Sequence, residues 1–250
     1  MLLLHLQLGG FIVVYQWLRQ RNWYNSEQGK RIIQWWMRRA CRILAVHISV
    51  SGEISSQGRT LFVANHISWI DIIALASVVQ VKFISKDSLR YWPLIGWLAT
   101  SVGTLLIRRG KYFVVTRVVA LIKRELNQRH AVLVFPEGTT TDGQQVAAFR
   151  SALLQSVSYS DAAVQAVALR YHTDGGLDRH APYIGNDNFV FHLLRLSLRN
   201  KTQLKLHFTP EFSTQKLDRR AVAGLAREQI ISALEDRVYP PLAAAARQVA

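Results

Sequence analysis

Two titratable residues interrupt an otherwise apolar stretch, LFVANHISWIDIIAL, at residues 61–75. His66 precedes Asp71 by five positions, and on a regular helix this offset would point the two side chains about 140° apart. They can meet if His66 lies in the turn before a helix and Asp71 lies in its first turn. Asn65 and Ser68 are residue types that commonly cap helix N-termini. In that arrangement the carboxylate holds one ring nitrogen and leaves the other free to take a proton. The alternative is a buried histidine at a helix cap, without a chemical role.

A second candidate lies where an apolar strand runs into a tight turn, at residues 131–143, AVLVFPEGTTTDG. Pro136 and the glycine that follows favour a turn whose backbone amides can face a ligand. Glu137, Gly138 and Thr139 would then lie at a strand end, where open α/β sheets place their ligands. The alternative is an ordinary surface turn.

A third candidate is the basic run at residues 103–111, GTLLIRRGK. Arg108, Arg109 and Lys111 follow a predicted buried strand, and such a cluster can hold phosphate through paired hydrogen bonds. The same residues also fit a solvated basic loop. The residues alone leave both readings open.

Beyond residue 45, short apolar runs alternate with helix-like stretches, which predicts an α/β domain over residues 45–250. Several runs are apolar throughout, as in strands covered on both faces, so we expect a mostly parallel central sheet flanked by helices. The polar loop at residues 172–187 could border a site. The predicted strands are residues 59–64, 81–85, 103–108, 131–135, 164–169 and 203–208, and the predicted helices are residues 70–79, 112–128, 145–157, 188–199 and 218–238.

Residues 1–44 predict an N-terminal membrane-associated helical pair. The first 18 residues carry no formal charge and reach the lower length limit for spanning a bilayer. Arg19 and Arg21 follow, and if the segment spans the bilayer they favour the cytoplasm for the rest of the chain. Gly9 and Gly10 weaken this helix and leave a shallow re-entrant insertion open. The alternative is a helix buried in the protein's own core.

Residues 30–44 predict an amphipathic helix at the membrane interface. The alternative is that its apolar face packs on the protein itself. One arc holds Ile32, Ile33, Trp36, Met37, Ala40, Ile43 and Leu44, and the other holds Arg31, Gln34, Arg38, Arg39 and Arg42.

Composition narrows the possible classes of protein. The chain has 250 residues, enough for one α/β domain with a small appendage, and a formal net charge of +15. This charge predicts an anionic partner, which could be nucleic acid, an acidic membrane or a charged ligand. The basic residues are spread along the chain with no visible binding module, so we expect no nucleic-acid partner. The single cysteine, Cys41, excludes an internal disulfide. No G-x-S-x-G, P-loop, G-x-G-x-x-G or H-E-x-x-H motif is present, which disfavours the enzyme classes that use them.

Taken in order, the candidates resemble the sequence blocks of the lysophospholipid acyltransferase family. NHISWID matches the family's N-H-x-S-x-x-D block, and FPEGTTTDG resembles its F-P-E-G-T block. Residues 86–109, KDSLRYWPLIGWLATSVGTLLIRR, look like the second block, whose arginine aligns best with Arg109. Residues 164–171, VQAVALRY, look like the fourth block. The resemblance covers about residues 45–210.

This resemblance implies direct acyl transfer in one complex, with His66 as the general base and Asp71 orienting it. The acceptor would be a lysophospholipid, in the first place 1-acyl-glycerol-3-phosphate, which would become phosphatidic acid. Acyl carrier protein or coenzyme A would deliver the acyl chain as a thioester. No metal or other cofactor is needed.

The resemblance also implies that Glu137, Gly138 and Thr139, together with Arg109, hold the glycerol or head group of the acceptor. Arg108 stands where the family often has Asp, so it adds positive charge to the same region. Because acceptor and product are lipids, the implied location is the bacterial inner membrane, with the catalytic domain on the cytoplasmic side.

Two further departures from the family pattern keep the acceptor open. Thr140 stands where the F-P-E-G-T block often continues with arginine, and Ala166 stands where the fourth block usually has proline. F-P-E-G-T-T resembles the branch with acyltransferases for lyso-ornithine lipid, which lacks glycerol phosphate, and this acceptor is the alternative. An inactive membrane scaffold is a further alternative, which the intact His66 and Asp71 disfavour.

Overall fold

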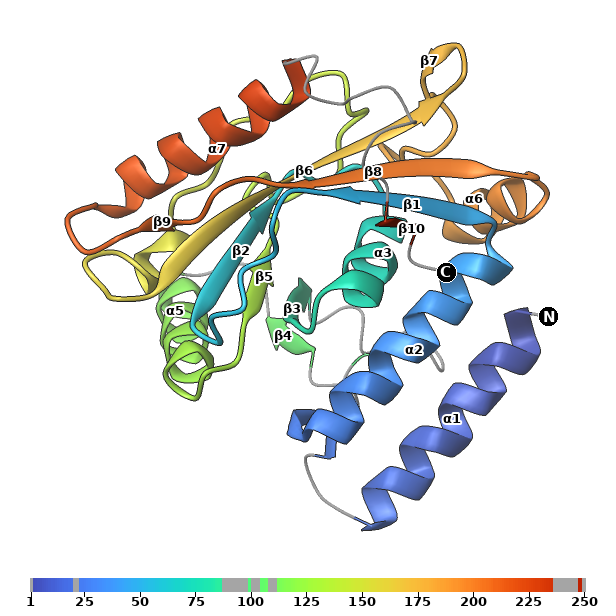
Figure 1. Ribbon diagram of the computed structural model, residues 1–250, viewed down its shortest axis with the longest axis horizontal. Coiled ribbons are helices and arrows are strands. Elements are labelled where there is room, and N and C mark those ends of the chain that lie inside the picture. Colours follow the sequence, from blue (N-terminus) through green and yellow to red (C-terminus); the bar gives the residue numbers. More distant parts are fainter. Residues whose placement is uncertain are drawn as a thin grey trace.

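The computed structural model describes residues 2–19, 23–86, 99, 104–107, 112–235 and 247–248. A twisted sheet divides the molecule, with helices on both faces (Figure 1). Its strand order is β10-β1-β8-β6-β2-β5-β3-β4, and the short strands β7 and β9 pair with β6. The strands are β1 (Val46–Ser51), β2 (Thr60–Ala64), β3 (Lys82–Lys86), β4 (Leu105–Ile107), β5 (Val132–Val134), β6 (Ala163–Thr173), β7 (Gly176–Leu177), β8 (Thr202–Phe208), β9 (Phe212–Ser213) and β10 (Arg247–Gln248).

Alternate residues of the central strands build two separate cores. Leu61 and Val63 of β2 face α5 (Tyr112–Asn127) and α7 (Arg219–Glu235), whereas Phe62 and Ala64 face the opposite side. There they meet α2 (Glu27–Ile43), α3 (Ile70–Val78) and α6 (Phe189–Ser197). Every side chain of β2 is buried, which confirms the expectation that its apolar run is covered on both faces.

The sheet is mixed, so the prediction of a mostly parallel sheet is wrong. Within the group β6-β2-β5-β3-β4 every strand is parallel to its neighbours, but β8 runs antiparallel to β6. The physical reason is the place at which the chain returns: the last residues of β6 pair with the first residues of β8, His172 with Gln203, so the segment that contains α6 brings the chain back to the same end of the sheet. The chain therefore re-enters the sheet from the end it has just left, and β8 must run back along β6.

The predicted helix over residues 145–157 is also wrong. Only a short 3₁₀ turn forms there, η3 (Leu153–Ser156). Arg227 of α7 donates hydrogen bonds to the carbonyls of Val146 and Ala147, and the amide of Arg150 donates to the Pro136 carbonyl. These long-range partners occupy main-chain groups that an α-helix would need. The remaining predicted helices and strands match described elements, and β1 is a strand that the apolar runs did not reveal.

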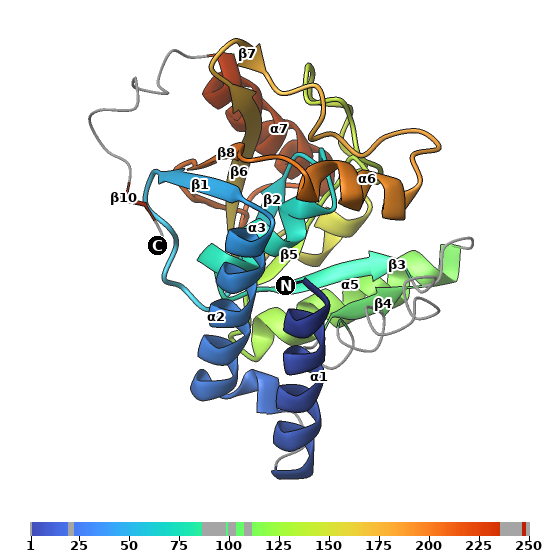
Figure 2. The same cartoon turned by 90° about the vertical axis from the view of Figure 1, so that its right-hand side faces the viewer.

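The N-terminal helices form an antiparallel pair, in which α2 lies against α3 (Figure 2). α1 (Leu2–Arg19) continues through Gly9, where an added Cβ would lie 2.3 Å from the Trp36 ring, so this glycine allows α1 to approach α2 closely. η1 (Trp23–Asn25) joins the two helices, and the Ser26 hydroxyl caps α2 by accepting from the Gly29 amide at 3.0 Å.

The apolar face of α2 packs on the protein itself, which is the alternative reading of residues 30–44. Trp36, Ala40 and Cys41 are buried, and the Arg38 guanidinium donates to the Ser77 carbonyl of α3 at 3.0 Å. Among the helices of the described residues, none combines the length and hydropathy needed to cross a bilayer.

Candidate active site

His66 and Asp71 meet at the junction between β2 and α3. The His66 Nδ1 lies 2.8 Å from Asp71 Oδ2, with the aspartate fully buried and the histidine side chain 17% exposed. β2 ends at Ala64 and α3 begins at Ile70, so the histidine lies in the connecting turn and the aspartate in the first helical turn. This is the arrangement that the five-residue offset required.

The Asp71 carboxylate is surrounded by donors. Oδ2 also accepts from the amides of Ile67 at 2.7 Å and Ser68 at 2.9 Å, and Oδ1 accepts from the Tyr171 hydroxyl at 2.6 Å. A carboxylate that only accepts must receive a hydrogen from His66 Nδ1. The Nε2 atom of His66 therefore carries the free lone pair that a general base needs.

The expected capping roles of Asn65 and Ser68 are not what the structure shows. Trp69 is the N-cap of α3 and makes no side-chain capping bond. The Asn65 amide instead exchanges two hydrogen bonds with the backbone of Leu169, at 2.8 and 3.0 Å, and so connects the turn between β2 and α3 to β6. The Ser68 hydroxyl is buried without a hydrogen-bond partner, and the Asp71 carboxylate accepts from the amides before the helix.

The turn after β5 encloses His66. The Phe135 ring stacks on the imidazole with ring centroids 4.0 Å apart, and the Thr141 amide donates to the His66 carbonyl at 2.8 Å. Gly138 has a φ of 73°, and its amide donates to the Phe135 carbonyl at 3.1 Å, so the turn needs a residue that tolerates the left-handed region. The Thr140 hydroxyl donates to the Tyr183 carbonyl.

Glu137 lies beneath this turn rather than in a cavity. Its side chain is buried, and neither carboxyl oxygen has a hydrogen-bond partner of normal geometry. Burial raises the pKa of Glu137 to about 7, the negative charge of Asp71 raises it further, and the nearby backbone of His66 and Ala147 opposes the increase. A substantial fraction of Glu137 is therefore protonated near neutral pH.

We expect Glu137→Gln to change the pH dependence of stability. The folded pKa of Glu137 lies above the unfolded value, so wild-type stability falls as pH rises from about 4.5 towards 7. A glutamine does not ionise, and the variant should gain about 2–3 kcal/mol relative to wild type between pH 5 and pH 8. Urea unfolding at both pH values measures this difference.

Glu125 provides a control of opposite sign. Burial alone would raise its pKa, but hydrogen bonds from Lys82, Arg124 and His130 outweigh burial and bring the pKa to about 2. Its ionised form therefore stabilises the fold, and this contribution grows as pH rises from about 2 to 4.5 and stays constant above that. Glu125→Gln should lose stability relative to wild type over this interval and show no further change between pH 5 and pH 8. A Glu137→Gln variant whose stability follows wild type at every pH would contradict the buried-carboxyl interpretation.

We also expect Tyr171→Phe to weaken the hydrogen-bonded pair of His66 and Asp71, which we call the dyad. The change removes the hydroxyl that donates to Asp71 Oδ1 and leaves a buried carboxylate oxygen unsatisfied, which costs about 1.5–3 kcal/mol. Activity that depends on His66 as a base should fall about tenfold because the carboxylate holds the imidazole less firmly. Urea unfolding and kcat measure the two effects, and Tyr159→Phe on the surface is the matched control. Unchanged kcat with lower stability would make Tyr171 purely structural.

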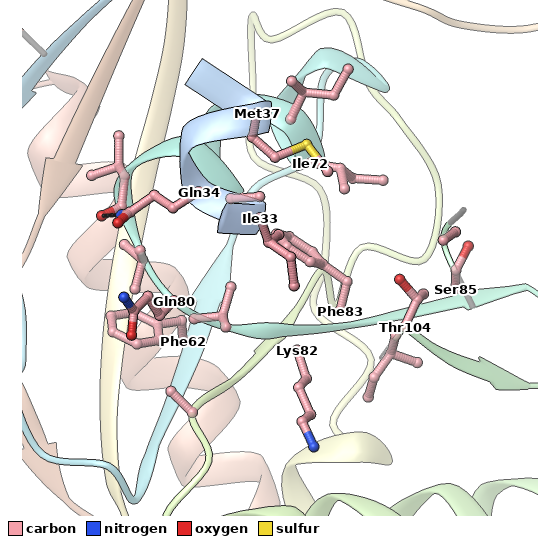
Figure 3. Close-up of a pocket in the computed structure, with 18 of the residues that line it drawn as sticks. Ile33, Gln34, Met37, Phe62, Ile72, Gln80, Lys82, Phe83, Ser85 and Thr104 are labelled. Atoms are coloured by element: carbon pink, nitrogen blue, oxygen red, sulfur yellow. Dashed lines mark hydrogen bonds between the residues drawn. The ribbon is translucent and has the colours of Figure 1, made fainter. Parts of the chain in front are cut away.

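A cavity of about 1150 Å³ begins at the dyad and runs beneath the sheet. Its middle is apolar, and Figure 3 shows Ile33 and Met37 of α2 beside Ile72 of α3 and Phe83 of β3. One end lies at the carboxyl ends of β2 and β5, and the other lies at the amino ends of the same strands. The first end is lined by His66, Gly138, Thr139, Thr140 and Tyr183, and the second by Gln57, Gly58, Lys82, Arg129 and His130.

Only some of the predicted site residues therefore face the cavity. His66, Gly138 and Thr139 line the cavity, whereas Asp71, Glu137, Asn65 and Ser68 lie behind it. Arg108 and Arg109, like most of the second sequence block, lie outside the described residues.

Three residues of the site were not given a role by the sequence. Phe135 and Tyr171 lie in the F-P-E-G-T block and the fourth block but were assigned no role there, and Arg150 lies outside every block. Arg150 is exposed, and its guanidinium carbon lies 3.2 Å from the position that a Cβ on Gly138 would occupy. A cation thus covers the F-P-E-G-T turn although Thr140 replaces the frequent arginine.

The chain is similar in sequence to two named acyltransferases. The lyso-ornithine lipid O-acyltransferase of Pseudomonas aeruginosa is 38% identical over 212 residues, covering 84% of this chain and 81% of the relative. The 1-acyl-sn-glycerol-3-phosphate acyltransferase of Neisseria gonorrhoeae is 30% identical over 177 residues, covering 70% of this chain and 69% of the relative.

The same fold occurs in a solved structure. The crystal structure of the 1-acyl-sn-glycerophosphate (LPA) acyltransferase PlsC from Thermotoga maritima matches with a TM-score of 0.66 and 18% identity, over 90% of this chain and 87% of that one. The Acyltransferase family model matches residues 46–170, a range that contains the His66 and Asp71 dyad and the turn that encloses it. The chain belongs to the acyltransferase family.

Proposed function

We propose that this acyltransferase transfers a fatty acyl group from a thioester donor to the free hydroxyl of a lysolipid, with His66 as general base. One observation carries the proposal: the Nε2 side of a carboxylate-held imidazole lies at the end of a long apolar cavity. A lipid substrate needs both features, since its chain must be buried and its hydroxyl must lose a proton.

The residues suit a direct transfer. His66 Nε2 takes the proton from the acceptor hydroxyl as its oxygen attacks the thioester carbonyl carbon. The carbon–sulfur bond then breaks, and the imidazolium returns the proton to the thiolate. Asp71 stabilises the positive imidazolium and keeps Nδ1 protonated. No acyl-enzyme is required, which agrees with the burial of Cys41, whose thiol pKa burial raises to about 12.

The cavity offers room for an acyl chain. Its apolar side chains come from α2, α3 and β3. Gly58 lines one end and His66 lines the other, and about eight residues of extended chain between them give a separation of roughly 25 Å. This length suits an extended long-chain acyl group. α2 is part of the cavity wall, so the division after residue 44 stays a prediction about folding units.

For the acceptor we favour lyso-ornithine lipid, with 1-acyl-glycerol-3-phosphate as the second candidate. The relative that is 38% identical bears the first activity in its name, and the relative that is 30% identical bears the second. Thr140 supports the first, because its hydroxyl is bonded to the Tyr183 carbonyl and supplies no cation for a phosphate. Gly138, Thr139 and Arg150, with Arg109 and Arg108, are proposed to surround the acceptor head group.

The donor in this proposal is an acyl carrier protein or coenzyme A thioester, and no metal or other cofactor takes part. The location follows from the substrates. α1 would hold the enzyme on the cytoplasmic side of the inner membrane, where acceptor and product reside, and the charge of +15 suits anionic lipid.

The test of function is an acylation assay of the full chain against several lysolipids with both thioester donors. We expect the highest kcat/KM with lyso-ornithine lipid. Preference for 1-acyl-glycerol-3-phosphate would select the second candidate. Thioester consumption without any acylated lipid would overturn the proposed function.

The anchoring role of α1 has a separate prediction. Leu4, Leu8 and Phe11 are exposed and lie on one side of the helix, away from the face that contacts Trp36. Replacing them with glutamine, glutamine and serine should lower vesicle affinity at least tenfold, because apolar contact with lipid is lost. Flotation with anionic vesicles measures binding, and transfer to a monomeric short-chain lysolipid should be unchanged. Undiminished flotation would assign the anchor to another element.

A further inference from the structure

The outer face of α6 is an exposed apolar surface. Val190, Phe191, Leu194 and Leu198 are 58, 74, 53 and 85% exposed. At 100° per residue they fall within an arc of about 100°, which we call the outer arc of α6. None of the four lines the cavity. The opposite face carries Phe189, His192, Leu193 and Leu196, which line the cavity or are buried in the core.

α6 is connected to residues 65–69, the turn between β2 and α3 that carries His66, which we call the catalytic turn. The Trp69 indole donates to His192 Nδ1 at 3.0 Å, so Nε2 of this histidine carries the hydrogen that it donates to the Pro182 carbonyl at 3.0 Å. The Tyr183 amide donates to the Ile67 carbonyl at 3.0 Å. These bonds connect the helix that carries the outer arc to the turn at the His66 end of the cavity.

The border of the outer arc is basic. Residues 189–201 contain Arg195, Arg199 and Lys201 and no carboxylate. Arg199 pairs with Asp178 at 2.7 Å, while Arg195 lies 3.5 Å from Asp187. An apolar face with cationic residues beside it is the pattern of an interfacial helix on an anionic bilayer.

A second apolar arc lies on the same side of the molecule. Leu4, Leu8 and Phe11 of α1 are 65, 38 and 76% exposed and fall within about 60° of the helix surface. α1 and α6 both lie on the side that faces the viewer in Figure 2, although more than 150 residues separate them in sequence. A single bilayer surface on this side can therefore reach both helices.

We propose that the outer arc of α6 inserts into the interface of an anionic bilayer and holds the catalytic end of the cavity against the membrane. The inference rests on the proposed lipid acceptor. It explains why Phe189 and Leu193 line the cavity while the next residues on the helix are apolar and exposed: one helix forms both the cavity rim and the membrane contact. A lysolipid then enters without leaving the apolar phase.

The direct test places a fluorophore on the arc. In the full chain, Leu194→Cys is labelled with an environment-sensitive nitrobenzoxadiazole dye, and the buried Cys41 thiol does not compete. Vesicles of phosphatidylethanolamine and phosphatidylglycerol should raise the emission at least twofold, and nitroxide-labelled lipid should quench it. Leu225→Cys on α7, at 41% exposure, is the matched control and should not respond.

A kinetic test uses Phe191→Ser, Leu194→Gln and Leu198→Gln together. The apparent KM for vesicle-borne lysolipid should rise about tenfold or more, while kcat with a monomeric short-chain lysolipid stays at the wild-type value. The control combines Val115→Ser, Tyr159→Ser and Leu225→Gln, exposed apolar residues of other elements, and should change neither constant.

The outcomes separate this inference from the proposed function. Fluorescence reports insertion without turnover, so absent acyl transfer does not affect it. A silent probe at position 194 on a protein that floats with vesicles would overturn the insertion. A response to protein concentration alone, or to acyl carrier protein without vesicles, would assign the arc to a second copy or to the donor. Equal loss with both acceptors would make the arc structural.

Discussion

His66→Ala should lower kcat by about three orders of magnitude, because removal of a positioned general base costs about 10²–10⁴-fold. The side chain is partly exposed at the end of the cavity, so its loss should leave the fold intact. Asp71 keeps three of its four donors in the variant: the amides of Ile67 and Ser68 and the Tyr171 hydroxyl. The measurement is single-turnover acyl transfer to lyso-ornithine lipid, with urea unfolding of the same sample.

His180→Ala is the matched control, since this histidine is exposed and lies outside the cavity lining. It should keep wild-type kcat. Full activity in His66→Ala would rule out the proposed mechanism, and loss of activity together with a collapsed unfolding transition would instead show a structural role for His66.

Asp71→Asn has the second largest expected effect on activity. An asparagine oxygen can still accept from the amides of Ile67 and Ser68, and its NH₂ group can donate to Tyr171, whose hydroxyl can rotate to accept. The fold is therefore retained, but the negative charge that stabilises the imidazolium is lost. We expect kcat to fall about 10²–10³-fold with little change in KM.

Asp71→Ala separates the charge of the aspartate from its structural bonds. Alanine leaves two amides and one buried hydroxyl without their acceptor, which should cost about 3 kcal/mol or more in the free energy of unfolding. Asp71→Asn should cost much less. If the two variants were equally destabilised, the hydrogen bonds around Asp71 would not be what supports the catalytic turn.

Local sequence predicted the parts of this protein that depend on neighbours in the chain. The offset between His66 and Asp71 required a strand, a turn and a helix start, and β2 and α3 provide them. The polar loop at residues 172–187 was expected to border a site, and Tyr183 within it lines the cavity. Apolar runs located the central strands because burial on both faces demands them.

Contacts between distant segments could not be predicted in the same way. Tyr171 lies 100 positions from the Asp71 it supports, and no periodicity in the sequence shows which carboxylate its hydroxyl meets. The helix predicted over residues 145–157 failed for a related reason, because Arg227 takes carbonyls that only the folded chain brings within reach.

The sequence by itself determined the chemical groups and their immediate backbone frame, since spacing along a chain sets local geometry. The tertiary structure decided which groups surround the dyad, the direction of β8 and the burial that raises the pKa of Glu137 to about 7. It also decided that α6 turns one apolar face to the cavity and the other outward, because a helix rich in apolar residues does not show in its sequence which face the core will cover.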